Sequence, residues 1–325
     1  MSPSLTSPVS GVRKSTRVVF IARFTQCYTV LVFFSPSLIV HPEEDRKYRS
    51  AKFSKPVPLP SVHDEAEVDL TVVIPAYNET KRMPAMMQST LAHLTSSACS
   101  ARSYEILIID DGSKDGTSNL ALDLAAKNPK IDIRVITLIK NLGKGGGVRH
   151  GMLHGRGRRL LMVDADGASR FEDLELLWKA MDKLSPDEKQ ASIAVGSRAH
   201  LVKTEAVVKR SILRNILMYG LHTILRIVGV GHIRDTQCGF KLFSRGAAQQ
   251  IFPYQHLATW IFDVEVLLLA KQLQIPVAEV PIQWHEVSGS KLNVVTDSLQ
   301  MLKDLLILRA NILLGRWKAP PRSKR

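Results

Sequence analysis

The sequence predicts an α/β protein in which a mostly parallel sheet is flanked by helices. Four short apolar segments alternate with segments of helical pattern, which is typical of parallel strands joined by crossover helices. A polar or glycine-rich motif directly follows each apolar segment. Because ligands bind at the carboxyl edge of such sheets, these motifs predict one site at that edge. With 325 residues, the chain can form one large domain of this kind with appendages.

The composition points to anionic partners and a reducing compartment. The formal net charge of +14 favours nucleotide phosphates, an anionic membrane face or nucleic acid as ligands. The three cysteines are widely spaced and form neither a disulfide framework nor a zinc-binding pattern: Cys27, Cys99 and Cys238.

The N-terminal segment is expected to lie outside the globular domain. Residues 1–17 form a basic leader, and residues 18–40 are long enough for a membrane anchor. That stretch is interrupted at Arg23, Gln26 and Pro36. A central arginine costs about 2.5–3.5 kcal/mol, but Arg23 lies near one end and can snorkel. A disordered leader and an organellar transit peptide are the alternatives. The basic residues that follow place the next domain on the cytosolic side, and residues 41–68 predict a linker.

The globular domain is expected over residues 69–290, with its elements in alternating order. Buried strands are predicted at residues 70–75, 104–110, 133–139 and 160–163. Helices are predicted at residues 82–94, after the turn at 111–116 through residue 127, and after a glycine-rich loop at 141–147. A longer helix is predicted at residues 206–228.

The C-terminal segment, residues 291–325, predicts an amphipathic helix and a basic tail. Its leucines form one face, and basic residues interrupt the rest, so it is a poor membrane span. The helix can lie in the membrane interface, where each basic residue near anionic headgroups contributes about 1 kcal/mol. A helix packed on the sheet explains the leucines equally well.

Three of the motifs at strand ends have the chemistry of a nucleotide site. The carboxylates of Asp110 and Asp111 can accept hydrogen bonds from a base or ribose, and Asn78 and Glu79 offer further polar contacts. Glycines around Lys144 allow backbone N–H groups to approach phosphate, while the lysine supplies positive charge. The spacing matches neither a Walker A motif nor a dinucleotide fingerprint. The structural alternative is a flexible loop.

The fourth motif, Asp164-Ala-Asp166, is a candidate metal site. Residues i and i+2 of an extended backbone point to the same side, so both carboxylates can face one point. A cation between them relieves the repulsion of two like charges. Oxygen ligands favour a hard divalent ion, Mg²⁺ or Mn²⁺, with open positions for phosphate oxygens. The alternative is a capping aspartate at a strand-to-helix turn.

Taken together, these motifs resemble the inverting nucleotide-sugar glycosyltransferases of family 2, which have the GT-A fold. The resemblance rests on residues 73–79, 110–117, 141–145 and 164–166. Residues 196–200, 233–243 and 262–265 are similar to the dolichyl-phosphate β-glucosyltransferases within that family. The resemblance covers roughly residues 70–317. The first 60 or so residues depart from the family, whose members carry a cleaner single-span anchor, and Gly147 stands where a residue such as alanine is expected.

The resemblance implies a GT-A (Rossmann-like) nucleotide-sugar-binding domain, membrane-associated amphipathic helices and a role for each site residue. It implies that UDP-glucose is bound by Pro75, Tyr77, Asn78, Glu79, Asp110, Asp111, Gly143, Lys144 and Asp164. It implies that the metal is bound by Asp164 and Asp166. It implies that the acceptor phosphate is bound by Arg198, Arg210, Arg214 and Arg234. Asp235, which would orient the sugar or the acceptor phosphate, completes the catalytic set with Asp164, Asp166 and Arg198. A solvated helix face is the alternative for the arginines.

The implied reaction is transfer of glucose from UDP-glucose to dolichyl phosphate with inversion. Its product is a glucose donor for lipid-linked oligosaccharide and protein N-glycosylation. The implied location is the endoplasmic reticulum membrane, with the catalytic domain facing the cytosol and a lipid surface as partner. A mannosyltransferase that uses GDP-mannose is the first alternative. A non-catalytic basic protein that binds membrane or nucleic acid is the second, although the aromatic platforms of RNA-binding proteins are absent from the sequence.

Overall fold

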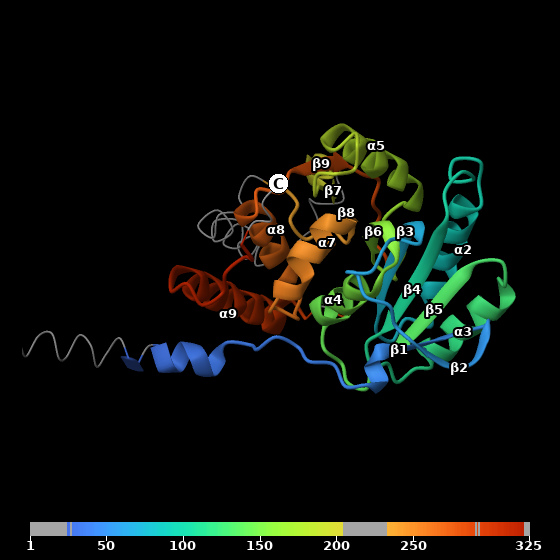
Figure 1. The fold of residues 1–325 in the computed structure, drawn as a ribbon. Helices are drawn as coiled ribbons and strands as arrows, with labels where there is room; N and C mark the ends of the chain where they lie inside the picture. The colour runs from blue at the N-terminus through green and yellow to red at the C-terminus, as the bar shows by residue number, and fades with distance from the viewer. Residues whose placement is uncertain (1–24, 27, 204–232, 290, 292, 322–325) are drawn as a thin grey trace, which may run out of the picture.

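The computed structural model describes residues 25–26, 28–203, 233–289, 291 and 293–321 (Figure 1). The helix expected at 206–228, which includes Arg210 and Arg214, lies outside the described residues, as do residues 1–24 of the leader and expected anchor. Residues 28–34 of the expected anchor are helical. None of the helices within the described residues is long and apolar enough to span a membrane.

The described residues form one sheet of nine strands in the order β2-β1-β5-β4-β3-β6-β8-β7-β9. The strands are β1 (Lys47–Ser50), β2 (Phe53–Pro58), β3 (Val68–Ala76), β4 (Tyr104–Asp110), β5 (Asp132–Thr137), β6 (Gly157–Val163), β7 (Ile193–Ser197), β8 (Phe240–Ser244) and β9 (Val277–Pro281).

The centre of the sheet is the parallel unit that the sequence predicts. β5, β4, β3 and β6 are adjacent and parallel, and each overlaps one of the four predicted strands. The remaining strands make the sheet mixed, because β8 runs antiparallel to both β6 and β7, while β7 and β9 are parallel. The carboxyl ends of β3 to β6 therefore lie along one edge, as the alternating pattern implies.

Helices cover both faces of the sheet (Figure 1). They are α2 (Met83–Leu94), α3 (Thr117–Lys127), α4 (Lys144–His154), α5 (Leu174–Leu184), α7 (Arg245–Ile251), α8 (Phe262–Gln272) and α9 (Val294–Leu313). Short 3-10 helices are η1 (Glu44–Arg46), η2 (Phe171–Asp173), η3 (Ala199–Lys203) and η5 (Phe252–Tyr254).

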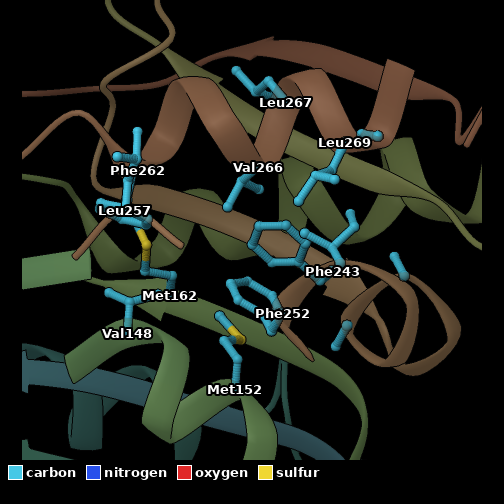
Figure 2. Packing of buried hydrophobic residues seen from close by; sticks show 14 of the residues in the cluster. Val148, Met152, Met162, Phe243, Phe252, Leu257, Phe262, Val266, Leu267 and Leu269 are labelled. Atoms are coloured by element: carbon cyan, nitrogen blue, oxygen red, sulfur yellow. The ribbon is translucent and has the colours of Figure 1, made fainter. Parts of the chain in front are cut away.

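Each central strand contributes side chains to two hydrophobic clusters, one on each face. In β4, Leu107 and Ile109 join the cluster under α4 and α8, while Ile106 and Ile108 join the cluster under α2 and α3. This alternation follows from the two-residue period of a strand, and it explains why buried parallel strands are continuously apolar. Figure 2 shows the first cluster, in which Phe243 and Phe252 meet edge to face with ring centroids 5.2 Å apart.

The linker expected at residues 41–68 is wrong for much of its length. β1 and β2 form an antiparallel hairpin, and β1 also pairs with β5 at the sheet edge. Just before it, Asp45 is buried, accepts a hydrogen bond from the Ile139 backbone N–H (2.9 Å) and contacts His41 (3.4 Å). Prolines suggested a linker, but an outer strand tolerates them because its outward N–H groups need no partner.

The glycine-rich loop expected at 141–147 is partly wrong as well, because α4 begins at Lys144 and includes Gly145, Gly146 and Gly147. Two of these glycines, Gly145 and Gly146, allow close packing. A Cβ on Gly145 would lie 2.6 Å from the Cβ of Phe262, and one on Gly146 would lie 2.6 Å from the Cβ of Leu142. The sequence predicts that these glycines let backbone N–H groups approach phosphate, whereas the structure shows Gly145 and Gly146 in close contact with neighbouring side chains.

Candidate active site

The four predicted motifs meet at the carboxyl edge of the sheet, as hydrogen bonds between their loops demonstrate. The Asn78 backbone N–H donates to the Ser113 hydroxyl (2.8 Å), and the Lys114 N–H donates to the Asn78 side chain (2.8 Å). Asn78 adopts a left-handed backbone conformation with φ of 54°, which asparagine tolerates better than most residues. The loops after β3 and β4 are thereby fixed to each other.

Asp111 joins the loop after β4 to the start of α4. Its carboxylate is 3% exposed and accepts hydrogen bonds from the backbone N–H groups of Leu142 (2.7 Å) and Gly143 (2.9 Å). Burial raises the pKa of Asp111 to about 6, although the two N–H donors oppose the shift. Asp110 is also buried and accepts from the Ser113 N–H (2.9 Å). Both carboxylates hold the loops in place, and a direct contact with a nucleotide stays a prediction for them.

The N-terminus of α4 has the geometry of an anion site. The first turn of a helix leaves backbone N–H groups without helical partners and carries partial positive charge. Lys144, at this end, adds a full charge. Gly143 adopts φ of 89°, and a Cβ there would lie 2.6 Å from the Ala258 carbonyl oxygen, so only glycine fits this approach. The predicted phosphate-binding motif therefore lies at a helix N-terminus, and its contact with a diphosphate stays a prediction.

Lys144 connects this anion site to the predicted metal ligands. Its ammonium group lies 2.7 Å from one oxygen of Asp164 and 2.8 Å from the other. Burial would lower the pKa of Lys144, but the charges of Asp164 and Asp263 outweigh burial and raise it. The anion site and the Asp164 carboxylate thus lie side by side, joined by a lysine that remains charged.

Asp164 and Asp166 fit a divalent cation. Each side chain is 28% exposed, so both can reach a ligand from solvent. Burial and the negative charge of Asp164 raise the pKa of Asp166, which shows that the two carboxylates repel each other. The Arg82 guanidinium lies 3.9 Å from Asp166. A pair of oxygen donors that is open to solvent is the chemistry that Mg²⁺ and Mn²⁺ favour, and binding of such an ion to both residues stays a prediction.

Gly239 packs against the predicted metal ligand Asp164, a contact that the sequence reasoning did not single out. The Asp164 carboxylate packs so closely on it that a Cβ would lie 2.0 Å from the Asp164 Oδ2 atom. The Asp164 backbone N–H also donates to the Gly239 carbonyl oxygen (3.2 Å). Gly239 belongs to the motif at residues 233–243, on which the family resemblance partly rests. The sequence therefore includes this glycine in a motif, but it does not show that the glycine packs against Asp164.

The sequence also does not predict the side chains that surround Glu79. This buried carboxylate accepts hydrogen bonds from Arg82 (2.7 Å from Nε to Oε2) and from Lys291 (2.8 Å from Nζ to Oε1). The Lys291 ammonium group also donates to the Asn78 carbonyl oxygen (2.8 Å) and lies 5.6 Å from the centroid of the Tyr77 ring. No sequence pattern links these residues, because Lys291 and Glu79 are far apart in the chain. Glu79 therefore organises the loop after β3.

Arg198 and Asp235, predicted for the acceptor side, form a two-pronged ion pair. The Nε and Nη2 atoms of Arg198 lie 2.7 and 2.8 Å from the Asp235 oxygens. Burial would raise the pKa of Asp235, but hydrogen bonds and charge from Arg198 hold it below its usual value. The Arg198 guanidinium also lies 5.3 Å from the centroid of the Trp284 ring. Asp235 therefore positions Arg198, and its direct contact with sugar or phosphate stays a prediction.

The other residues predicted near the acceptor differ in their surroundings. Arg234 is exposed, and its backbone N–H donates to Glu279 (3.2 Å). Cys238 is fully buried, and burial raises its pKa to about 11, so the thiol stays protonated and acts as a packed side chain.

The described residues contain one further cluster with metal-ligand chemistry, formed by His93, Cys99 and Glu175. Arg102 already holds Glu175 through two hydrogen bonds of 2.7 and 2.8 Å. Burial raises the pKa of Cys99 to about 11, which disfavours the thiolate that a metal requires. We interpret this cluster as a structural contact between α5 and the segment that follows α2.

Comparisons with known proteins show which sequences this chain resembles. The sequence model described as "Glycosyl transferase family 2" matches residues 71–252. The human dolichyl-phosphate β-glucosyltransferase is 46% identical over 87% of this chain and 87% of its own. The enzyme of that name from Saccharomyces cerevisiae is 44% identical over 92% of this chain and 93% of its own. Among solved structures, glucosyl-3-phosphoglycerate synthase from Mycobacterium tuberculosis, in complex with Mn²⁺ and UDP-glucose, has a TM-score of 0.49 at 16% identity and covers 78% of this chain and 81% of its own.

Proposed function

Because the chain belongs to glycosyltransferase family 2 and, within it, to the dolichyl-phosphate β-glucosyltransferases, we propose that it transfers glucose from UDP-glucose to dolichyl phosphate. One observation of the site carries the assignment. The anion site at the start of α4 lies directly beside the Asp164 carboxylate, with Lys144 in contact with both of its oxygens. A nucleotide diphosphate needs both parts, one to receive its phosphates and one to hold the cation bound to them.

The donor side would bind UDP-glucose through the loops after β3, β4 and β5. The fixed loop at Tyr77 to Glu79 and the N-terminus of α4 would contact the nucleotide. Asp164 and Asp166 would hold Mg²⁺ or Mn²⁺, which would offset the negative charge of the departing diphosphate. Lys144 stays charged and adds to that stabilisation.

The acceptor side needs no strong catalytic base. A phosphate monoester has a second pKa of about 6, so dolichyl phosphate is largely dianionic at neutral pH and is itself a nucleophile. Its oxygen forms a bond to the anomeric carbon of glucose while the bond to the UDP oxygen breaks. This in-line displacement converts an α-linked donor into a β-linked product. The protein would align two anionic substrates and offset their repulsion, and Arg198 is the residue proposed for the acceptor side.

Arg198→Lys is expected to lower kcat/KM for dolichyl phosphate by about 10- to 100-fold. Asp235 engages the Nε and Nη2 atoms, which leaves Nη1 for an acceptor phosphate, and a lysine cannot bind both partners in this planar arrangement. The KM for UDP-glucose should change less than twofold. Steady-state kinetics with each substrate varied in turn measures the difference, and an equal loss for both substrates would refute the assignment to the acceptor.

The C-terminal side of the molecule supports a membrane surface as partner. On α9, Leu305 and Leu308 are buried, so the helix does pack on the domain. Its outer face nevertheless exposes apolar side chains at Val295 (55%), Leu299 (63%), Leu306 (61%) and Leu313 (68%). Residues 28–34 lie beside this helix (Figure 1), where Asn311 donates to the Ser35 hydroxyl (2.8 Å). They add Phe33 (82%) and Phe34 (56%).

We propose that this apolar face rests in the interface of a bilayer, where the polyprenyl chain of the acceptor resides. The endoplasmic reticulum membrane, with the catalytic domain on its cytosolic face, is the proposed location.

Sugar transfer to dolichyl phosphate tests the function directly. Radiolabelled UDP-glucose and GDP-mannose are offered to the full chain in vesicles, with Mg²⁺, with Mn²⁺ and with EDTA. Glucose transfer that EDTA abolishes is expected, with a β-linked product by NMR. Transfer of mannose instead would change the donor, a retained α configuration would refute single displacement, and no transfer from either donor would favour a non-catalytic role.

A further inference from the structure

The loop at residues 255–261 packs against the first turn of α4, which forms the proposed anion site. The Gly146 backbone N–H donates to the Ala258 carbonyl oxygen (3.2 Å), and the Gln255 side chain donates to the Gly145 carbonyl oxygen (2.9 Å). The Ala258 oxygen also leaves no room for a side chain at Gly143. The first turn of α4 is therefore in direct contact with this loop. Figure 2 shows Leu257 and Phe262, at either end of that contact, above Val148 of α4.

The same loop is held on its other side by α9 and the residues after it. The Thr259 hydroxyl donates to the Asp304 carboxylate (2.7 Å), which is 4% exposed and also accepts from Gln300 (2.8 Å). The His256 ring stacks on Trp317 with centroids 4.1 Å apart and an interplanar angle of 7°. A buried carboxylate that hydrogen-bonds a loop hydroxyl is a strong restraint, because a charged acceptor strengthens the bond and burial makes its loss costly.

The interior of the loop is also fixed. The buried Glu265 carboxylate accepts from the backbone N–H groups of His256 (2.9 Å) and Leu257 (2.7 Å). The ring of Trp260, next to Thr259, lies 5.7 Å from the Lys144 ammonium group. A displacement at Thr259 would therefore reach both the backbone of α4 and its lysine, because the loop has little freedom to absorb it.

We propose that Thr259 and Asp304 are positioning residues for the donor diphosphate, and that α9 sets the geometry of the anion site through the loop at residues 255–261. Neither side chain belongs to the predicted site. Their hydrogen bond holds the Ala258 carbonyl against the Gly146 N–H, and it thereby fixes the first turn of α4, beside which the donor phosphates are proposed to bind. The inference rests on the proposed donor site. The inference adds that the proposed donor site depends on α9, the helix whose outer face is proposed to lie in the membrane interface.

Thr259→Val tests the inference, because valine keeps the shape of threonine and removes only the hydroxyl. We expect UDP to bind the full chain about tenfold more weakly, because the loss of one hydrogen bond to a charged group has an effect of this size. Calorimetry in detergent with Mn²⁺ measures the affinity. The KM for UDP-glucose should rise in parallel, whereas the KM for dolichyl phosphate should stay within twofold. Thr259→Ser, which restores the hydroxyl, should recover UDP binding. Thr296→Val, on the exposed side of α9, is the matched control and should bind UDP like the wild type.

The outcomes separate the inference from the function on which it rests. If the wild type binds UDP and Thr259→Val binds it equally well, the positioning role is overturned and the proposed function stands. A lower melting temperature with unchanged UDP affinity would mark the hydrogen bond as structural only, and equal losses for both substrates would do the same. A wild type that binds no UDP would overturn the proposed function and this inference with it.

Discussion

Asp166→Asn is expected to lower kcat for glucosyl transfer by about a thousandfold or more while the protein keeps its fold. The expectation follows from charge. A divalent cation needs both carboxylates, and charge stabilisation of a leaving diphosphate by a metal is worth several kcal/mol, which corresponds to a factor of that size. Asparagine preserves the one backbone hydrogen bond that Asp166 accepts, from the Ala168 N–H (3.0 Å). Enzyme assays and electron paramagnetic resonance of bound Mn²⁺ in the presence of UDP measure the loss.

The stability of Asp166→Asn separates a metal ligand from a structural carboxylate. Burial and Asp164 raise the pKa of Asp166, so its charged form is disfavoured in the folded protein, and removing the charge should leave the melting temperature unchanged or higher. Asp123→Asn, an exposed change on α3, is the control for a lost charge remote from the site. An aggregated or strongly destabilised Asp166→Asn protein would instead point to a structural role, as would an active variant that still binds Mn²⁺.

Gly239→Ala is expected to reduce activity by about a hundredfold or more through displacement of a neighbour. The added Cβ would lie 2.0 Å from the Asp164 Oδ2 atom, a distance that atoms cannot maintain, so the carboxylate or the backbone of β8 must move. A shift of about 1 Å in a metal ligand can cost a factor of about 100 in rate. Mn²⁺ binding in the presence of UDP should weaken in parallel with kcat.

Gly246→Ala is the matched control for this change. Gly246 lies in α7, where a Cβ would meet its nearest neighbour, the Cβ of Ala191, at 3.7 Å, an ordinary contact. The substitution should therefore leave activity unchanged, and the higher helix propensity of alanine should stabilise the protein slightly. A Gly239→Ala variant with wild-type kinetics would show that the Asp164 carboxylate does not need its present position.

The central sheet and the assembly of the site were predictable because both follow from local patterns. Apolar runs identify the four parallel strands, and parallel topology brings the residues after them together without knowledge of any contact. The contact of Lys144 with Asp164 is a consequence of that topology. The predicted strand at residues 104–110 agrees with β4 at both ends, since Asp110 begins the polar motif.

What the sequence did not predict depends on contacts between distant segments. The environment of Glu79 includes Lys291, which lies in the segment before α9, and no periodicity relates them. Gly239 is constrained by the Asp164 side chain, which directly follows the neighbouring strand β6. The hairpin at residues 47–58 was missed because its prolines are unfavourable inside a sheet and acceptable only at its edge. In each case the structure around a residue depends on which distant residue or strand it contacts, and the local sequence does not identify that partner.

The position of that hairpin also determines how the sheet ends. An unpaired strand edge exposes a row of N–H and C=O groups on which another chain can add, and this is a common start of aggregation. Without β1, the edge of β5 would be such a surface, formed by a strand with four consecutive buried residues, Ile133 to Ile136. β2 closes the row with Lys55, Pro56 and Pro58, which repel or cannot bond an incoming strand. The hairpin ahead of the catalytic fold is therefore expected to keep this edge of the sheet from pairing with a second copy of the chain.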